Sequence, residues 1–596
     1  MLQCRVFIRQ GTIERILSVA CDTHILDAMR HAGIHGLHAP CGGAMSCGKC
    51  LVKAEGELSA PSEKEFAVIG KETLARGYRL GCSARILGDV TIVLPEEASA
   101  NILDKTSDII RSINPFVITR SIELSEGTVD EPLDYMSSVF RAAPELRREF
   151  SAVVLKDAGI RSSLTTHRET LIISGDRLLG FASGERSYGI AVDIGTTTIV
   201  CHIADLKCGN ILGTVSSLND QRSFGADVIS RIDHANKGNA DSLTKTLRSQ
   251  IDGMIQDLCV KVSVRPDDIH SAVCAGNSVM LHFLSGASVK RMAVSPFLST
   301  FLQGMEIENE RLFPSIHPRG LTYLMPSIAT FVGGDITAGI LSSGMCRRDG
   351  ISLFIDFGTN GEIAICKDNE IFTCATAAGP AFEGANISCG VGGVSGAVFS
   401  VTLHNNELKI DTIDDDEPIG VCGSGIIDLA AVLLETGFAD ETGAFTGIVP
   451  SVVHGLEMRP EEDRIVLPGG LYFTQKDMRE VQLAKAAVRA GIETLMGHFS
   501  VNSAEIDRVF VAGGFGSFID IESAMRIGLL RREWADRIEF LGNASGEGAL
   551  LALLDQNYRK AAADIAENAS YLELSGSSLF NKLFAEYMLF PGKLKK

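Results

Sequence analysis

The sequence predicts a multidomain α/β protein, and three observations along its 596 residues support this prediction. Three cysteines lie close together in a glycine-rich loop near the amino end, between strand-like segments. A polar stretch over 96–115 then separates this region from the rest of the chain. Beyond it, an apolar strand followed by an acidic, glycine-containing turn and a second strand occurs at 188–205 and again at 352–366. The repeat indicates a duplicated domain.

Composition limits the classes of function. Hydrophobic residues make up 45% and charged residues 22%, as in ordinary globular proteins. The net charge of −19 argues against a nucleic-acid partner. The start, MLQCRVFIRQ, does not have the pattern of a signal peptide, and no run of 18 apolar residues predicts a membrane span. We therefore expect a soluble, cytoplasmic protein without a membrane partner.

The cysteine loop predicts a metal site. Cys41, Cys47 and Cys50 give the spacing C-x5-C-x2-C, and Cys82 follows in LGCSAR. Thiolates hold iron–sulfur clusters, and the glycines between them let the loop fold tightly so that N–H groups face the sulfurs. A structural zinc site is the alternative, but zinc sites usually contain two C-x2-C pairs and this region has one. We predict a [2Fe–2S] cluster on these four cysteines.

The segments around the loop predict its fold. QCRVFI and ERILSV read as a strand pair, HILDAMRHAG as a short helix, and KCLVKAEGEL and DVTIVLP as later strands, which is a β-grasp order. Residues 1–95 resemble a [2Fe–2S] ferredoxin, with the x5 spacing of the adrenodoxin type. Cys4 and Cys21 have no partners at ligand spacing, so we expect them to be structural.

The next two segments carry no chemical motif. Residues 96–115 are polar, lack a long apolar stripe and read as a linker. Residues 116–186 mix helical and strand patterns, and they predict a small α/β middle domain that acts as a spacer or docking unit.

Two turns in the second half predict a phosphate site. Asp193 ends an apolar strand and Gly195 follows it, and Asp356 and Gly358 repeat this arrangement. A carboxylate at a strand end can hold hydrated Mg²⁺, and glycine lets the backbone approach a phosphate. The neighbouring polar groups could contact phosphates: Thr196, Thr197, Gly358, Thr359 and Asn360. A third glycine turn, VFVAGGFGSF, contains Gly513 and Gly514, where the backbone could pass against a nucleoside.

These three turns resemble those of the acetate kinase, sugar kinase, Hsp70 and actin superfamily of ATPases, over roughly 187–596. The resemblance implies that Asp335, in FVGGDITAGIL, positions the attacking water. It also implies that Gln482 and Lys485, three residues apart on one predicted helix, contact the nucleoside, although Gln482 replaces the glutamate of Hsp70-like proteins. CGSGIIDLAAVL and GEGALLALL look like the connecting helices of this superfamily. The chain has no G-x-x-x-x-G-K-[ST] motif, and GVGGVSG departs from G-x-G-x-x-G.

The two halves together resemble the ATP-dependent reductive activators of corrinoid proteins over nearly the whole chain. AAGPAFEGANISCG, DMREVQLAKAA and VAGGFGSF are among the stretches that carry this resemblance. It implies a one-electron reduction of Co(II) to Co(I) in a corrinoid protein that serves methyl transfer, with a [2Fe–2S] cluster, ATP and Mg²⁺. It further implies an unidentified low-potential electron donor and a possible homodimer. The loop Phe382–Gly396, and Ser395 within it, could approach the corrinoid, or the loop could be a flexible connection inside the ATPase part.

Three other functions stay open at this point. The chain could activate another low-potential metalloenzyme, or join a ferredoxin to a nucleotide sensor that does not turn over. A small-molecule kinase is the third, and it would leave the cysteine loop without a purpose.

Overall fold

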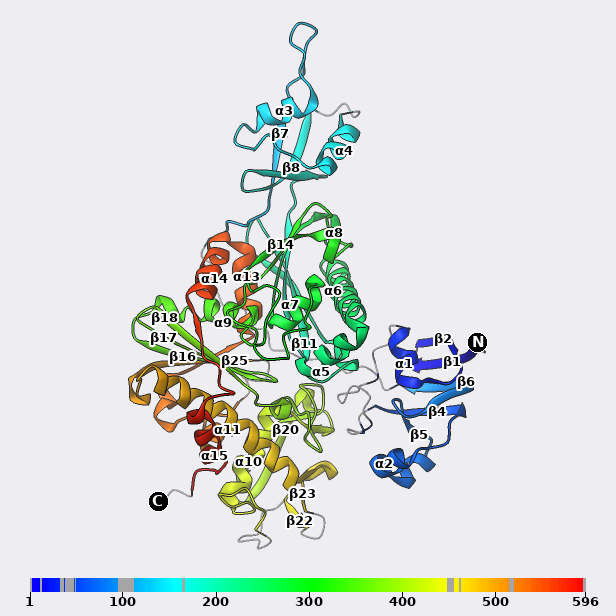
Figure 1. The fold of residues 1–596 in the computed structure, drawn as a ribbon, viewed down its shortest axis with the longest axis vertical. Coiled ribbons are helices and arrows are strands. Elements are labelled where there is room, and N and C mark those ends of the chain that lie inside the picture. The colour runs from blue at the N-terminus through cyan, green and yellow to red at the C-terminus, as the bar shows by residue number, and fades with distance from the viewer. Residues whose placement is uncertain are drawn as a thin grey trace.

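In the computed structural model, the chain forms several separate sheets (Figure 1). The six-stranded N-terminal sheet lies to one side, a small three-stranded unit lies at one end, and two further six-stranded sheets form the centre (Figure 1). The structure describes residues 3–10, 13–32, 37, 45, 48, 50–94, 112–162, 167–446, 455–459, 463–513 and 519–592. Most of the predicted linker, 96–115, lies outside them.

The N-terminal sheet has the strand order β2-β1-β6-β4-β5, with β3 paired to β6. Its central pair, β1 and β6, is parallel, whereas β1–β2 and β4–β6 are antiparallel, as the predicted β-grasp requires. Alternate residues of β1, Cys4, Val6 and Ile8, are buried because successive side chains of a strand face opposite sides. The elements are β1 (Gln3–Gln10), β2 (Ile13–Ala20), β3 (Thr23–His24), α1 (Ile25–His31), β4 (Leu51–Leu58), α2 (Glu63–Ala75), β5 (Tyr78–Leu80) and β6 (Arg85–Leu94).

Cys4 and Cys21 form a disulfide across the end of the β1–β2 hairpin, with their Cα atoms 5.5 Å apart. Their sequence spacing did not predict this pairing. Both belong to the apolar core of the N-terminal sheet or pack against it, so their expected structural role agrees with their position.

A small three-stranded sheet with two helices follows. Its order is β7-β8-β9, and its helices pack a separate core against it. Asp134 and Ser151 cap the two helices by accepting hydrogen bonds from backbone N–H groups. The ion pair between Arg319 and Asp157, 3.6 Å long, joins this unit to the first central sheet. The elements are β7 (Ile118–Glu123), α3 (Tyr135–Ala142), α4 (Ala152–Arg161), β8 (Arg168–Ser174) and β9 (Arg177–Ala182).

The two central sheets repeat one topology. In each, an antiparallel hairpin and a third antiparallel strand lie on one side, and two parallel strands lie on the other. The predicted duplication is therefore confirmed. The first sheet has the order β12-β11-β10-β13-β15-β14, and the second has β26-β25-β16-β17-β18-β27.

The first central sheet and its helices form the lobe that we call lobe I. Its elements are β10 (Tyr188–Ile194), β11 (Thr198–Asp205), β12 (Ile211–Leu218), α5 (Val228–His234), α6 (Ala240–Val262), β13 (Ile269–Gly276), α7 (Ser278–Ser285), β14 (Met305–Glu308), α8 (Asn309–Leu312), β15 (Leu321–Leu324) and α9 (Gly334–Ser343).

The second central sheet, its two small satellite sheets and the C-terminal part of the chain form lobe II, although one helix of this part, Ala544–Leu554, packs on the first central sheet. Its elements are β16 (Ile351–Phe357), β17 (Gly361–Lys367), β18 (Glu370–Thr376), β19 (Ala397–His404), β20 (Glu407–Thr412), β21 (Gly420–Val421), α10 (Gly423–Thr436), β22 (Glu457–Arg459), β23 (Arg464–Val466), β24 (Tyr472–Thr474), α11 (Gln475–His498), β25 (Ile506–Ala512), α12 (Ile521–Arg526), β26 (Ile538–Gly542), α13 (Ala544–Leu554), α14 (Gln556–Asn568), β27 (Ser570–Tyr571) and α15 (Ser578–Tyr587).

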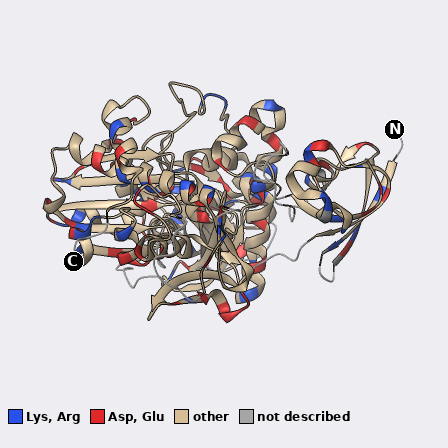
Figure 2. Ribbon diagram, turned by 90° about the horizontal axis from the view of Figure 1, so that it is seen from below, with Lys and Arg blue, Asp and Glu red and all other residues tan. Residues whose placement is uncertain are grey.

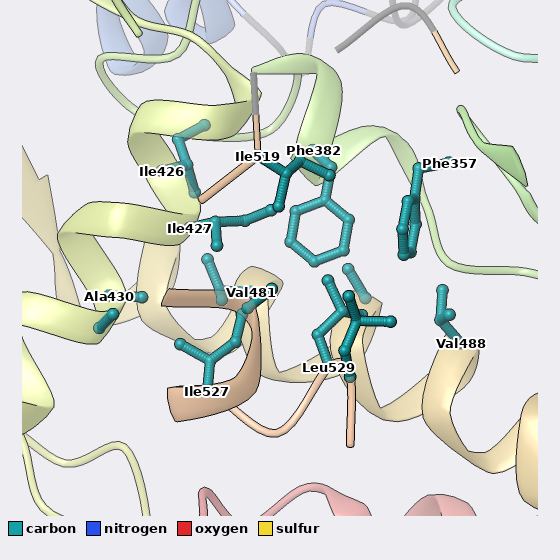
Figure 3. Packing of buried hydrophobic residues seen from close by; sticks show 14 of the residues in the cluster. Phe357, Phe382, Ile426, Ile427, Ala430, Val481, Val488, Ile519, Ile527 and Leu529 are labelled. Carbon is teal, nitrogen blue, oxygen red and sulfur yellow. The ribbon is translucent and has the colours of Figure 1, made fainter. Parts of the chain in front are cut away.

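Close packing of α9 against α13 joins the two lobes. A Cβ on Gly548 would lie 2.2 Å from the carbonyl oxygen of Ala338, so only glycine permits this approach. Both stretches expected to form connecting helices are helical, as α10 and α13. The largest apolar core lies in lobe II, where Phe382 packs between Phe357 and Ile427 (Figure 3).

The N-terminal sheet touches lobe I through α1. Arg30 donates a hydrogen bond to the backbone oxygen of Ser223 and lies over the ring of Phe224, 5.3 Å from its centroid. Ser223 ends a short turn that begins after β12. Asn219 caps this turn, and its Nδ2 also donates to the oxygen of Gly195, 2.9 Å away. One short segment therefore contacts both the N-terminal sheet and the first acidic turn.

Acidic and basic residues are interspersed along the described chain (Figure 2). Within the described ranges, no helix combines the length and apolar character needed to cross a bilayer.

We predict that Arg79→Ala destabilises the N-terminal sheet by about 3–5 kcal/mol, because it leaves a buried carboxylate without its cation. Arg79 Nε and Nη2 donate to Glu65 at 2.9 and 3.0 Å, and Glu65 also accepts from the Leu80 N–H at 2.8 Å. Hydrogen–deuterium exchange of β5 and β6 measures the change. The exposed pair of Arg85 and Asp22 is the control, since Arg85→Ala should cost at most about 1 kcal/mol. Equal effects of the two variants would contradict the prediction.

Candidate functional site

Two of the four predicted cluster cysteines lie together in the N-terminal unit. Cys50 directly precedes β4 and Cys82 lies in the turn after β5, and both are buried. Their sulfurs are 3.2 Å apart. The Gly81 N–H donates to the Cys50 oxygen at 2.8 Å, which holds the two segments together. Cys41 and Cys47 lie outside the described residues.

This sulfur pair fits a shared metal centre. A tetrahedral site with metal–sulfur bonds of about 2.3 Å places neighbouring sulfurs roughly 3.8 Å apart, so a small shift brings both thiolates to one metal. Gly48, in the same loop, has φ +68, and a Cβ there would lie 3.1 Å from Val68. Glycine is therefore the residue that this turn accommodates without strain. The geometry of these two sulfurs alone suits iron or zinc.

A cavity of about 230 Å³ lies between lobes I and II. Both acidic turns contribute to it, as do the first turn of α9, the end of β25 and the start of α13. Of the residues predicted for the nucleotide site, the cavity lining includes Asp193, Thr196, Thr197, Asp335, Asp356, Gly358, Thr359, Asn360 and Gly513. Residues far apart in sequence therefore meet where the duplicated hairpins face each other.

The first turn is held by contacts from three other elements. Asp193 Oδ1 accepts a 2.6 Å hydrogen bond from Ser545 at the start of α13. The Thr196 hydroxyl accepts from Asn277 Nδ2 at 3.0 Å, and Asn277 in turn caps α7. The buried Arg231 donates from Nη2 to the Thr196 oxygen at 2.6 Å. These contacts hold the first turn in place from three sides.

The second turn is built in the same way. The Gly358 N–H donates to the Asn360 oxygen at 3.0 Å and closes the turn after β16. Gly513 follows β25 with φ +113, and a Cβ there would lie 2.2 Å from the Phe357 oxygen. Gly513 is therefore fixed as glycine by the neighbouring strand, and its backbone lies beside Asp356. Gly514 falls outside the described residues.

Burial raises the pKa values of the aspartates in the cavity, and the crowding of carboxyl groups adds to this for two of them. Burial is the largest cause for all three aspartates, raising the pKa of Asp193 to about 6, of Asp335 to about 7 and of Asp356 to about 8. Mutual repulsion adds to the pKa of Asp335 and Asp356. Among the described lining residues none is lysine, arginine or histidine. The site therefore favours a bound cation.

Two further acidic residues of this cluster were not predicted from the sequence. Glu362 stands directly opposite Asp356 in the β16–β17 hairpin, and burial raises its pKa well above the ordinary value. Burial also raises the pKa of Glu383, whose Oε2 accepts from the hydroxyls of Thr197 at 2.7 Å and Thr359 at 2.9 Å. Glu362 comes directly after the predicted turn, in the strand that leaves it. The sequence could have indicated Glu362 if the predicted site had included this strand. It could not have indicated Glu383, because only tertiary contacts bring that residue there.

The cation would need ligands beyond the protein. Within the part of the chain that the structure describes, no three histidine, cysteine or carboxylate side chains converge closely enough to hold a metal ion by themselves. Mg²⁺ is usually bound by one or two carboxylates, with waters and substrate phosphates completing its shell. The partly buried acids and the open space between the turns fit that pattern.

Gln482 and Lys485 lie on one face of α11, as predicted, but they do not line the cavity. Gln482 Nε2 donates to the oxygens of Thr442 and Met588 at 3.1 and 2.6 Å, and Lys485 Nζ donates to the Leu589 oxygen at 2.5 Å. Both side chains thus hold the segment after α15. Their contact with a nucleoside stays a prediction.

The predicted corrinoid-facing loop lines the same cavity through Phe382, Glu383, Val391, Gly392, Gly393 and Val394. Ser395 does not line it. The Ser395 hydroxyl instead donates to Asp416 Oδ2 at 2.5 Å.

Known families cover most of the chain. A 2Fe-2S iron-sulfur cluster binding domain matches residues 7–87, the RACo middle region matches 188–348, and the C-terminal domain of RACo, the ASKHA domain, matches 350–596. The corrinoid activation enzyme RamQ of Eubacterium limosum is 32% identical over 97% of this chain and 98% of its own length.

This chain belongs to the family of reductive activators of corrinoid proteins.

Two further comparisons agree with membership of this activator family. The [Co(II) methylated amine-specific corrinoid protein] reductase of Methanosarcina barkeri is 25% identical over 67% of this chain and 76% of its own. A solved structure titled reductive activator for corrinoid,iron-sulfur protein superposes with a TM-score of 0.74 at 31% identity, covering 99% of this chain and 98% of the other.

Membership of the activator family confirms the predicted family and fold class. It also supports an iron–sulfur cluster in the N-terminal unit and nucleotide binding in the ASKHA part. The family's middle region coincides with lobe I, so the small unit at 116–186 lies between two matched segments.

We predict that the nucleotide-free activator loses stability as the pH rises from about 4 to about 8 through this acidic cluster. The three aspartates have folded pKa values of about 6, 7 and 8, above the ordinary value of about 4. The folded state therefore binds more protons in this window, and stability falls with rising pH. The apparent Tm measures the effect, which Mg²⁺ with AMPPNP should reduce.

Asp356→Asn removes the group with the highest of these three pKa values and should flatten this Tm profile, whereas Asp349→Asn, at an exposed position in the same lobe, should leave it unchanged. Identical profiles for wild type and Asp356→Asn would contradict the assignment.

Proposed function

We propose that this protein reduces the Co(II) form of a corrinoid protein to Co(I) in an ATP-dependent step, so that the corrinoid can again accept a methyl group. The proposal depends on one observation: the same chain contains a buried cysteine pair and an acid-lined cavity between two lobes. The full-length similarity to the corrinoid activation enzyme RamQ supports it.

We infer that Cys41, Cys47, Cys50 and Cys82 hold a [2Fe–2S] cluster. The cluster, when bound, supplies one electron at low potential. The chain's own contribution is to bury Cys50 and Cys82 and to close the loop with glycine, which keeps water away from the thiolates. An unidentified low-potential electron donor reduces the cluster again after each transfer, and a homodimer is a possible assembly.

Energetics explain why a nucleotide site accompanies the electron donor. A plant-type [2Fe–2S] ferredoxin has a potential near about −400 mV, and the Co(II) corrinoid is harder to reduce. Each 59 mV uphill costs about 1.4 kcal/mol for one electron, so a gap of roughly 200 mV costs about 5 kcal/mol. Binding that favours one redox state of the partner can offset this cost, and ATP turnover resets the complex.

The cavity residues divide the work on the nucleotide. Asp193 and Asp356 hold Mg²⁺, directly or through water, because both end central strands at the cavity. The two turns donate hydroxyl, amide and N–H groups to phosphates through Thr196, Thr197, Gly358, Thr359 and Asn360. Asp335 orients the attacking water from the first turn of α9. The nucleoside is bound by Gly513, Gly514, Gln482 and Lys485. Its binding requires the segment after α15 to move away from Gln482 and Lys485, which hold it in the nucleotide-free protein.

The alternative functions predict different results. Activation of another low-potential metalloenzyme would leave a Co(II) corrinoid protein unchanged in the assay below. A ferredoxin fused to a nucleotide sensor would reduce the corrinoid equally well without hydrolysis.

We expect Asp356→Asn and Asp193→Asn to lower the ATP-dependent yield of Co(I) by about tenfold or more, because each removes a charge that holds the cation. The reduced protein is mixed with MgATP and a Co(II) corrinoid protein, and the Co(I) absorption band is followed. Asp349→Asn is the matched control on an exposed loop. An unchanged yield in both cavity variants would favour the sensor.

We also predict about two irons and negligible zinc per anaerobically purified chain, as a [2Fe–2S] site requires. Cys50→Ser should lose most of this iron, since Cys50 is one of the two buried, adjacent thiols. Cys208→Ser, at an exposed cysteine far along the chain, should retain it. Metal analysis and EPR spectra before and after dithionite measure both, and zinc in place of iron would contradict the cluster assignment.

A further inference from the structure

Glu383 bridges the two turns that face each other across the cavity. Its Oε2 accepts hydrogen bonds from the hydroxyls of Thr197 in lobe I and Thr359 in lobe II. Its Oε1 also faces the second turn, lying 3.9 Å from the position that a Cβ on Gly358 would take. One carboxylate thus engages a donor from each lobe.

The backbone around Glu383 is fixed on both sides. Phe382, at 1% exposure, packs between Phe357 and Ile427 (Figure 3). Gly384 has φ +76, and a Cβ there would lie 2.3 Å from the Val391 oxygen. With the turn Pro380–Glu383 held in this way, rotation of the Glu383 side chain is the main freedom left at this position.

A carboxylate at this position conflicts with a nucleotide phosphate. The hydroxyls of Thr197 and Thr359 are donors that the proposed phosphate site would use, and Glu383 already occupies both. Carboxylate and phosphate are both anionic acceptors, so they compete for these donors and repel each other. The buried cation Arg231 donates to the Thr196 and Gly225 oxygens.

The geometry points to Glu383 as an internal competitor of the nucleotide phosphate, which holds the two lobes together in the nucleotide-free protein and is displaced when the phosphate binds. This inference rests on the proposed nucleotide site. Because Glu383 must be displaced first, it lowers the affinity of that site for the nucleotide. Displacement frees Thr197 and Thr359 to bind the phosphate instead. Return of the carboxylate favours release of the spent nucleotide, so Glu383 acts as a positioning residue for the two turns.

The test compares binding of MgAMPPNP and of adenosine to the full-length protein by calorimetry. Glu383→Gln removes the charge at nearly unchanged shape, and Glu383→Ala removes the bridge altogether. Both should bind MgAMPPNP about tenfold or more tightly than wild type. Adenosine has no phosphate, so its affinity should not change. A residue that merely supported the fold would give weaker binding when removed, which separates the two roles.

The bridge itself has a second readout. Without nucleotide, Glu383→Ala should speed hydrogen–deuterium exchange in residues 194–199 and 357–361, and MgAMPPNP should restore slow exchange. Glu370→Gln, at an exposed glutamate in the β17–β18 hairpin, is the matched control and should alter neither measurement. Unchanged or weaker MgAMPPNP binding in both Glu383 variants would overturn the inference. No MgAMPPNP binding to wild type would instead overturn the proposed nucleotide site.

Discussion

Five carboxyl groups share the cleft between the two central sheets, and much of the arrangement around them follows from that crowding. Asp193, Asp335, Asp356, Glu362 and Glu383 all line one cavity. Like charges in a partly buried space repel one another, and burial disfavours each charge in addition. The cluster can persist because hydrogen bonds from Ser545, Thr197 and Thr359 stabilise individual acids and because a cation with phosphates can neutralise the rest. The repulsion among these acids is therefore fully offset only when a cation with phosphates occupies the cavity. The relative position of the two lobes should then depend on whether the cavity is occupied.

The duplication explains how such a cleft forms. Each lobe supplies a hairpin whose turn follows a central strand, and the shared topology brings both turns to the same place between the sheets. Glycines fix the approach of neighbouring segments, as at Gly513 beside Phe357 and Gly548 beside Ala338. A side chain at Gly548 would push α13 away from α9, and one at Gly513 would push the end of β25 away from β16. The cleft therefore depends on small residues as much as on acidic ones.

Electron donor and nucleotide site lie in separate units, yet described contacts connect them. Arg30 on α1 contacts Ser223 and Phe224, and the cap of the same turn, Asn219, reaches Gly195 in the first acidic turn. Arg231 binds the backbone of the same turn at Thr196. The segment after β12 thus contacts both the N-terminal sheet and the first acidic turn, so a shift of either one can displace the other.

Sequence by itself determined the local features: the cysteine spacing, the strand–turn–strand pattern around Asp193 and Asp356, and the shared helical face of Gln482 and Lys485. These features depend on residue type, on periodicity and on residues that are close together in the sequence, so they do not require knowledge of the tertiary fold. Only the tertiary structure decided that Glu383 joins Thr197 to Thr359, that Cys4 pairs with Cys21, and that Gln482 and Lys485 hold the segment after α15. Each of these is a contact across a long stretch of chain or between elements. Spacing within a sequence does not encode such distances, because the packing of whole sheets and helices sets them.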